Sequence, residues 1–221
     1  MIFPKTILAF LPEHRHRFPV FGCPLAIMLL VLVMGTGCSS FRTVSRDPGD
    51  SSQVLYEEAL RNWTVHTEIY KGFDPILLTS GTFRSSAFRR AYVNKFAWDY
   101  HLDSQIKKKM LADEQAMSEN NLEFILAVYS PNPEQPRLDS RDSIWRIYIE
   151  KEGLGRFPPS EIQNLRKQRT QLEQLYPYIT PWNQIYRIQF RIPKPIKATG
   201  QLHLILTGVL GETRLTFNLE G

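Results

Sequence analysis

The stretch IYRIQFRI, residues 185–192, alternates between apolar and polar side chains along its whole length. Successive side chains of a β-strand point to opposite faces, so a strand here would carry one apolar row and one polar row. The apolar row consists of Tyr186, Ile188, Phe190 and Ile192, and the polar row of Arg187, Gln189 and Arg191. Such alternation is typical of an antiparallel sheet that covers a core with one face only.

Other segments repeat this alternation and extend the predicted sheet. They lie at residues 122–129, 144–150, 202–206 and 215–219. Residues 63–70 and 75–83 are two further strand candidates that a short turn separates, so they predict a hairpin. A second hairpin is predicted where residues 208–212 join the last two strands. The pattern favours a two-layer antiparallel β-sandwich, for which an immunoglobulin-like order is one arrangement. An α+β sheet with helices on one face is the alternative.

Three segments follow the helical period instead. The first, residues 54–62, is short, and the second, residues 84–119, is the longest. Two apolar stripes in the second segment fall out of register near residues 99–101, which predicts a bend or two helices, with Ser85 or Ser86 as the cap. The third segment, residues 160–175, is expected to begin at Ser160 and to end before a proline. The chain is therefore expected to be mainly β with a helical segment near the start of its domain.

Composition excludes some functional classes. The chain has 27 basic and 22 acidic residues, a net charge of +5, and these charges are spread along its length. A nucleic-acid-binding protein would carry a dense basic stripe, so we expect no nucleic-acid partner. Its two cysteines, Cys23 and Cys38, both precede the predicted domain, which therefore has no thiol for a disulfide, a zinc site or a nucleophile.

The N-terminal segment has the parts of an export signal. Lys5, Arg15 and Arg17 give its first residues a positive charge, and residues 18–37 contain no charged residue. A strongly apolar run ends at Met34, and the small residues of Gly35-Thr36-Gly37 precede Cys38. A basic stretch, an apolar stretch and small residues before a cleavage site define a secretory signal.

The sequence GTGC at residues 35–38 resembles the lipobox of bacterial lipoproteins, although this family prefers leucine where the chain has Gly35. The resemblance implies cleavage after residue 37, a diacylglycerol thioether on Cys38 and a further acyl chain, such as palmitate, on the new amine. It also implies, with Ser39 after the cysteine, an outer-membrane protein anchored by lipid and facing the periplasm. The alternatives are a retained signal-anchor in the inner membrane and a soluble exported protein.

The predicted organisation has three parts. Residues 1–37 are the signal peptide, and residues 38–53 are the lipidated N-terminus with a tether rich in Ser, Asp, Pro and Gly. Residues 54–221 form a single domain, which length and composition allow to bury one core. The tether would place this domain beside a membrane.

Catalytic motifs are absent from the sequence, and no pair of histidines has the spacing of metal ligands, so we expect no cofactor and no metal. The weak acid/base candidates are Asp99, His101 and Asp103. On one continuous helix Asp99 and Asp103 would share a face, and paired carboxylates can serve hydrolysis. An envelope hydrolase acting on glycan or lipid is therefore the alternative function.

The segment from Tyr176 to Trp182 concentrates three aromatic residues and two prolines in one predicted loop. Prolines stiffen a loop, and exposed aromatic rings can stack on sugars or enter a partner. Tyr176, Tyr178 and Trp182 are the candidate partner-binding residues, unless they fold back over the end of the sandwich. The favoured function is a non-catalytic binding or assembly module of the envelope, whose partner is a protein or a glycan.

Overall fold

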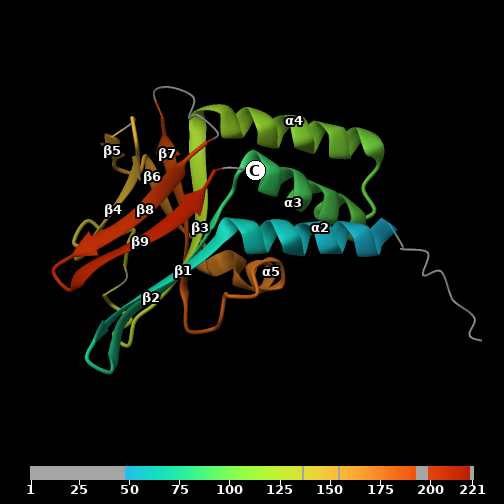
Figure 1. Ribbon diagram of the computed structural model, residues 1–221. Helices are drawn as coiled ribbons and strands as arrows, with labels where there is room; N and C mark the ends of the chain where they lie inside the picture. The colour runs from blue at the N-terminus through green and yellow to red at the C-terminus, as the bar shows by residue number, and fades with distance from the viewer. Residues whose placement is uncertain (1–47, 136, 154, 193–198, 220–221) are drawn as a thin grey trace, which may run out of the picture. The chain divides into compact units, whose positions relative to one another are not determined.

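The computed structural model describes residues 48–135, 137–153, 155–192 and 199–219, and Figure 1 shows their arrangement. Nine strands of these residues form two antiparallel sheets. The five-stranded sheet has the order β1-β2-β3-β7-β6, with β1 (Thr64–Lys71), β2 (Asp74–Phe83), β3 (Asn121–Tyr129), β7 (Gln184–Arg191) and β6 (Glu161–Asn164). The four-stranded sheet has the order β5-β4-β8-β9, with β5 (Gly155–Phe157), β4 (Trp145–Lys151), β8 (Gln201–Gly208) and β9 (Gly211–Asn218).

The main core lies between the two sheets and consists of the apolar rows that alternation predicts. Phe124 of β3 is fully buried, and its ring lies 5.0–5.8 Å from the rings of Phe83, Phe190 and Phe217. The apolar residues of β3, β4, β7, β8 and β9 that were expected inside all belong to this cluster. The antiparallel sandwich and the mixed α+β class are thus confirmed.

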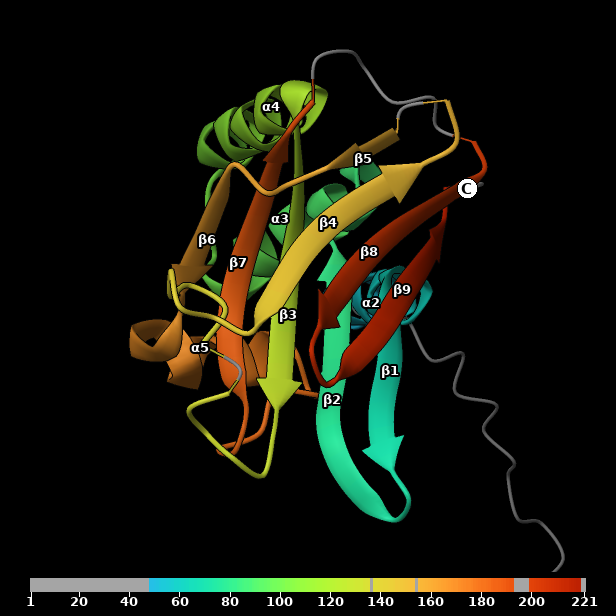
Figure 2. The ribbon, with the colours of Figure 1, turned by 90° about the vertical axis from the view of Figure 1, so that its left-hand side faces the viewer.

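A layer of helices covers the other face of the five-stranded sheet, as Figures 1 and 2 show from two sides. It contains α2 (Pro48–Trp63), α3 (Ser86–Asp99), α4 (Ser104–Asn120) and α5 (Arg169–Leu175). A second cluster under these helices includes Phe88, Ile125, Leu172 and Ile185. The sequence left the sandwich and the sheet covered by helices as two alternative predictions. The structure combines them, because both faces of β3 and β7 are buried.

Strand order distinguishes this sandwich from the immunoglobulin arrangement. Three consecutive strands, β1, β2 and β3, form a meander within one sheet. In an immunoglobulin domain the third strand crosses to the other sheet. The predicted β1–β2 and β8–β9 hairpins are both present.

The predicted long helical segment is two helices, α3 and α4, with the break where the stripes lose register. Ser85 caps α3, since its Oγ accepts a hydrogen bond of 3.1 Å from the backbone N–H of Phe88. Asp103 caps α4 in the same way, and His101 between the helices has a positive φ of 49°. The chain therefore reverses between Asp99 and Asp103.

Two predicted boundaries are wrong. Residues 160–165 are not helical, because Glu161–Asn164 pairs with β7 as strand β6 and Ser160 donates to the carbonyl oxygen of Gln189 instead of capping a helix. Within the predicted helix, the helical parts are the 3₁₀ turn Arg166–Gln168 and the helix α5 that follows it. At the other end, α2 begins at Pro48 within the predicted tether, and proline is well tolerated in the first turn of a helix.

Helix α2 runs into strand β1 without a connecting residue, since one ends at Trp63 and the other begins at Thr64. The Trp63 ring packs edge-on against Phe83, with centroids 5.6 Å apart. The hydroxyls of Thr64 and Thr82 are hydrogen-bonded at 2.7 Å. Contacts on both sides of the junction thus attach it to β2.

Candidate functional site

The aromatic loop before β7 divides into packed and exposed residues. Tyr176 is buried at 2% exposure, and its ring lies 6.2 Å from that of Phe88 under the helices. Tyr178 is half-buried. Trp182 differs, because 79% of its surface is exposed. Of the three predicted partner-binding residues, Trp182 alone presents most of its ring to solvent.

Hydrogen bonds explain why Tyr178 turns inward. Its hydroxyl lies 2.8 Å from the hydroxyl of Thr82 and donates to the carbonyl oxygen of Ile125 at 3.2 Å. The His66 ring packs edge-on against the Tyr178 ring, with centroids 6.0 Å apart. Burial raises the pKa of Tyr178 well above its usual value. Tyr178 therefore joins the loop to β2 and β3 as a structural residue.

The acid/base candidates do not form a site. Asp99 is the last residue of α3 and pairs with Lys95 at 2.7 Å. The Oδ1 atom of Asp103 accepts hydrogen bonds from the backbone N–H groups of Gln105 and Ile106 at the start of α4. All three candidates, Asp99, His101 and Asp103, are exposed. Asp99 and Asp103 do not share one helix face, because α3 ends at Asp99 and α4 begins after Asp103, at the predicted break.

Cys38 and the predicted signal peptide lie outside the described residues. Among the helices that are described, none is both long and apolar enough to cross a membrane. In the same parts of the chain, His, Cys, Asp and Glu residues form no group of three or more suited to hold a metal ion. His66 and His203 are instead hydrogen-bonded to Ser80 and Thr216 of neighbouring strands.

A group of exposed apolar side chains lies where hairpins and loops turn at one end of the sandwich. We call it the tip surface, and it consists of Tyr70, Phe73, Trp182, Val209 and Leu210. Phe73 is fully exposed and Val209 is 85% exposed.

Strand register places these residues at the same end of the sheet. Strands β2 and β7 both pair antiparallel with β3, so the turn before β2 and the loop before β7 share one end. Figures 1 and 2 both draw that turn and that loop at the lower end of the sheet. The β8–β9 turn reaches β1, since a Cβ atom on Gly211 would lie 3.2 Å from Ile69.

Sequence reasoning identified only Trp182 of the tip surface. A signal for the rest was present, since tight turns usually consist of Gly, Asn, Asp or Pro. Here Phe73 follows Gly72 in the first turn, and Val209-Leu210 fills the second. Several exposed apolar side chains at one end of a sheet, rather than one alone, are a sign of an interaction surface.

No protein-family model, curated protein or solved structure matches this chain.

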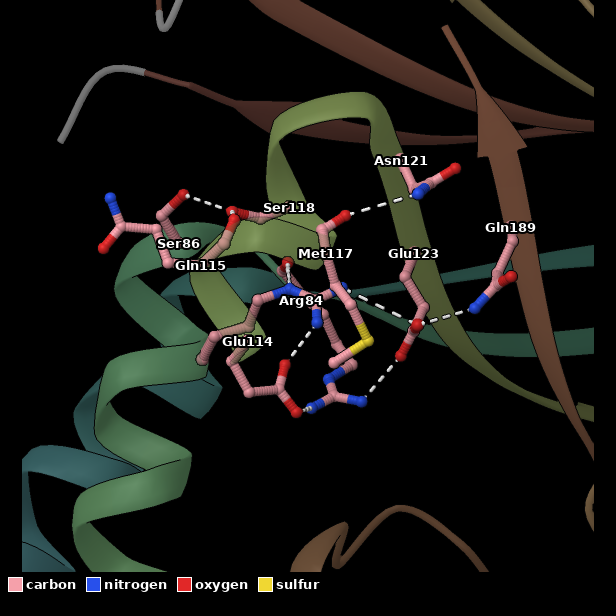
Figure 3. A network of polar contacts seen from close by, with 10 residues as sticks. Arg84, Ser86, Glu114, Gln115, Met117, Ser118, Asn121, Glu123 and Gln189 are labelled. Atoms are coloured by element: carbon pink, nitrogen blue, oxygen red, sulfur yellow. Dashed lines mark hydrogen bonds and ion pairs between the residues drawn. The ribbon is translucent and has the colours of Figure 1, made fainter. Parts of the chain in front are cut away.

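A buried network of charged side chains lies between the helices and the five-stranded sheet. Arg84, which follows β2, donates to Glu123 of β3 at 2.6 Å and to Glu114 of α4 at 2.9 Å. Arg89 of α3 pairs with the same two carboxylates. Figure 3 shows Glu114 and Glu123 approaching from α4 and β3, and Gln189 of β7 donating to Glu123 at 3.0 Å. Two arginines and two glutamates thus balance their charges.

Electrostatics keep Glu123 ionised. Burial alone would raise its pKa, but Arg84 and Arg89, with hydrogen bonds from Gln189 and Arg84, outweigh burial, and the pKa of Glu123 is lowered. A carboxylate paired in this way is a poor proton donor or acceptor at neutral pH. The network therefore joins α3 and α4 to β3.

Proposed function

We propose that the chain is a lipid-anchored bacterial envelope protein that binds a partner protein through its tip surface and performs no catalysis. The observation that carries the proposal is that Phe73, Trp182 and Val209 lie at one end of the sandwich, each at least 79% exposed. Aromatic side chains are enriched in protein interfaces because they bury a large area at low conformational cost.

A protein partner fits this surface better than a glycan does. Sugars stack on flat aromatic rings, whereas the aliphatic residues Val209 and Leu210 gain free energy when a partner removes them from water. The tip surface has both kinds of side chain. The glycan remains as an outcome of the experiment below.

The lipid anchor is supported by the lipobox-like sequence before Cys38. A thioether-linked diacylglycerol with a further acyl chain would hold the protein stably, since two or more chains are needed for firm anchoring. Mass spectrometry of the mature N-terminus tests this. Acylated Cys38 is expected, and an N-terminus at Met1 would refute the anchor.

Site-specific photocrosslinking in the native envelope tests the partner. A crosslinker at position 73 or 182 should yield an adduct with the same identified protein, and a crosslinker at the exposed Lys108 of α4 should not. The double variant F73S/W182A, probed at position 209, should lose that adduct. Adducts with glycan, or equal adducts from all positions, would overturn the proposal of a protein partner.

A further inference from the structure

A cavity of about 170 Å³ lies beside the charged network, between α3, α5 and the five-stranded sheet. Its polar lining consists of Arg84, Tyr92, Gln168, Gln171, Tyr176 and Arg187. The two arginines come from the sheet side, Tyr92 from α3, and the rest from the 3₁₀ turn, α5 and the residue after it. Polar groups from several elements thus meet at one small space.

Arg187 is the surplus positive charge of this cavity. Arg84 and Arg89 are balanced by Glu114 and Glu123, whereas Arg187 has no ion pair or side-chain hydrogen bond among the described residues. The carboxylate on α5, Glu173, pairs with Arg169. An arginine without a carboxylate partner beside a partly closed cavity favours an anion.

Other groups in the lining have unused hydrogen-bonding capacity. The buried Nε of Arg84 has no acceptor in the described parts of the chain. The Tyr92 and Tyr176 hydroxyls likewise have no hydrogen bond within those residues, although Tyr176 is 2% exposed. Burial raises the pKa of both tyrosines, so both hydroxyls keep the proton that they can donate.

We infer that this cavity binds a phosphate group, carried either by a lipid headgroup or by a soluble phosphate ester. Guanidinium and phenol donors approach from both the sheet and the helices, which suits an acceptor with oxygens on several sides. A water molecule occupies about 30 Å³ in the liquid, so the cavity holds a group of phosphate size and no whole cofactor. The rest of the ligand would extend into solvent. This inference goes beyond the proposed function and does not depend on it.

Calorimetric titration of the full-length chain in neutral detergent with inorganic phosphate is the first test. The variant R187Q should weaken binding about tenfold or more, because it removes a charge-assisted contact. The variant Y176F should weaken it about fivefold, the value of one hydrogen bond. The matched control is R191Q, since Arg191 lies on the same strand and the same side but outside the cavity lining.

The source of the phosphate is distinguished with vesicles of phosphatidylcholine, alone or mixed with phosphatidylglycerol. Both lipids carry a phosphate diester, so Arg187-dependent binding to either kind of vesicle that phosphate inhibits identifies a lipid headgroup. Phosphate binding with no Arg187-dependent binding to either kind of vesicle identifies a soluble ester. The inference is overturned if phosphate does not bind, or if R187Q binds it as well as the wild type or as R191Q. Thermal unfolding of R187Q should match that of R191Q, since Arg187 has no structural partner in the described residues.

Discussion

The two faces of β3 are closed by different chemistry. Toward the four-stranded sheet, Leu122, Phe124, Leu126 and Val128 pack in the main core cluster of hydrophobic residues. Toward the helices, Ile125 and Ala127 share the face with Glu123, whose carboxylate binds arginines from two directions. One strand of nine residues thus takes part in a hydrophobic core and in a charged one.

The difference lies in what each face requires of its partners. The free energy of apolar packing is roughly proportional to the area buried and does not depend on direction. Several arrangements of similar side-chain volume therefore satisfy it. A buried ion pair needs both members in place, because the loss of one leaves an unpaired charge in a low-dielectric setting. The apolar face therefore tolerates repacking, whereas the charged face requires Glu114 and Glu123 to meet two arginines.

The largest effect is expected from F124A on the apolar face. Removal of a fully buried ring in contact with three others should lower the free energy of unfolding by about 4–5 kcal/mol. Urea denaturation measures this loss. F124L should cost clearly less, because it leaves a smaller cavity, and equal losses for the two variants would contradict the packing argument.

The variant E123Q tests the charged face. It should lower the free energy of unfolding by about 3 kcal/mol at pH 7, because it leaves Arg84 and Arg89 with one carboxylate fewer. The exposed E161Q on the neighbouring edge strand is the control and should change stability little.

The stability difference between the wild type and E123Q should depend on pH. Arg84 and Arg89 hold the pKa of Glu123 in the folded state below its usual value, so its ionised form contributes stability above that usual value and the contribution is lost as the pH falls through the folded-state pKa. The difference between wild type and E123Q should therefore shrink from pH 7 to pH 3. A constant difference over that range would show that charge is not the cause.

A smaller effect is expected from Y178F. The variant removes a hydroxyl that contacts Thr82 and Ile125, and it should cost about 1 kcal/mol, since Thr82 keeps its hydrogen bond to Thr64. Thermal unfolding detects a shift of that size. A loss as large as that of F124A would mean that the loop belongs to the main core.

The smallest effect on stability is expected at the tip surface. F73S and W182A should each change the free energy of unfolding by less than about 0.5 kcal/mol, because both side chains are largely exposed. A marked loss of stability in either variant would indicate that the residue supports the fold, and it would remove the reason to assign it to an interface.

Strands were predictable from sequence where one local pattern decides them. In β7 and β8 the alternation of apolar and polar residues is enough, since each row meets a different environment. The second buried face of β3 also had a signal, because Ile125 and Ala127 make the side opposite Phe124 apolar as well.

The features that the sequence did not predict depend on contacts between residues that are far apart in the chain. Ile162 fits a helix period, but its segment pairs with β7 because an open edge of the sheet lies beside it. Arg84, Glu114 and Glu123 come from separate segments, and no spacing rule connects them. The aromatic loop was found by composition, yet only its tertiary neighbours decide that Tyr178 packs and Trp182 does not.

The junction of α2 and β1 has a mechanical consequence. A load applied at Pro48 would pass through sixteen helical residues and reach the Thr64–Thr82 contact with no loop to absorb it. The Trp63–Phe83 contact resists rotation at the same point. The helix would therefore transmit a force at its first turn directly to the outer hairpin of the sheet. That force would act first on β1, the strand that leads to Phe73.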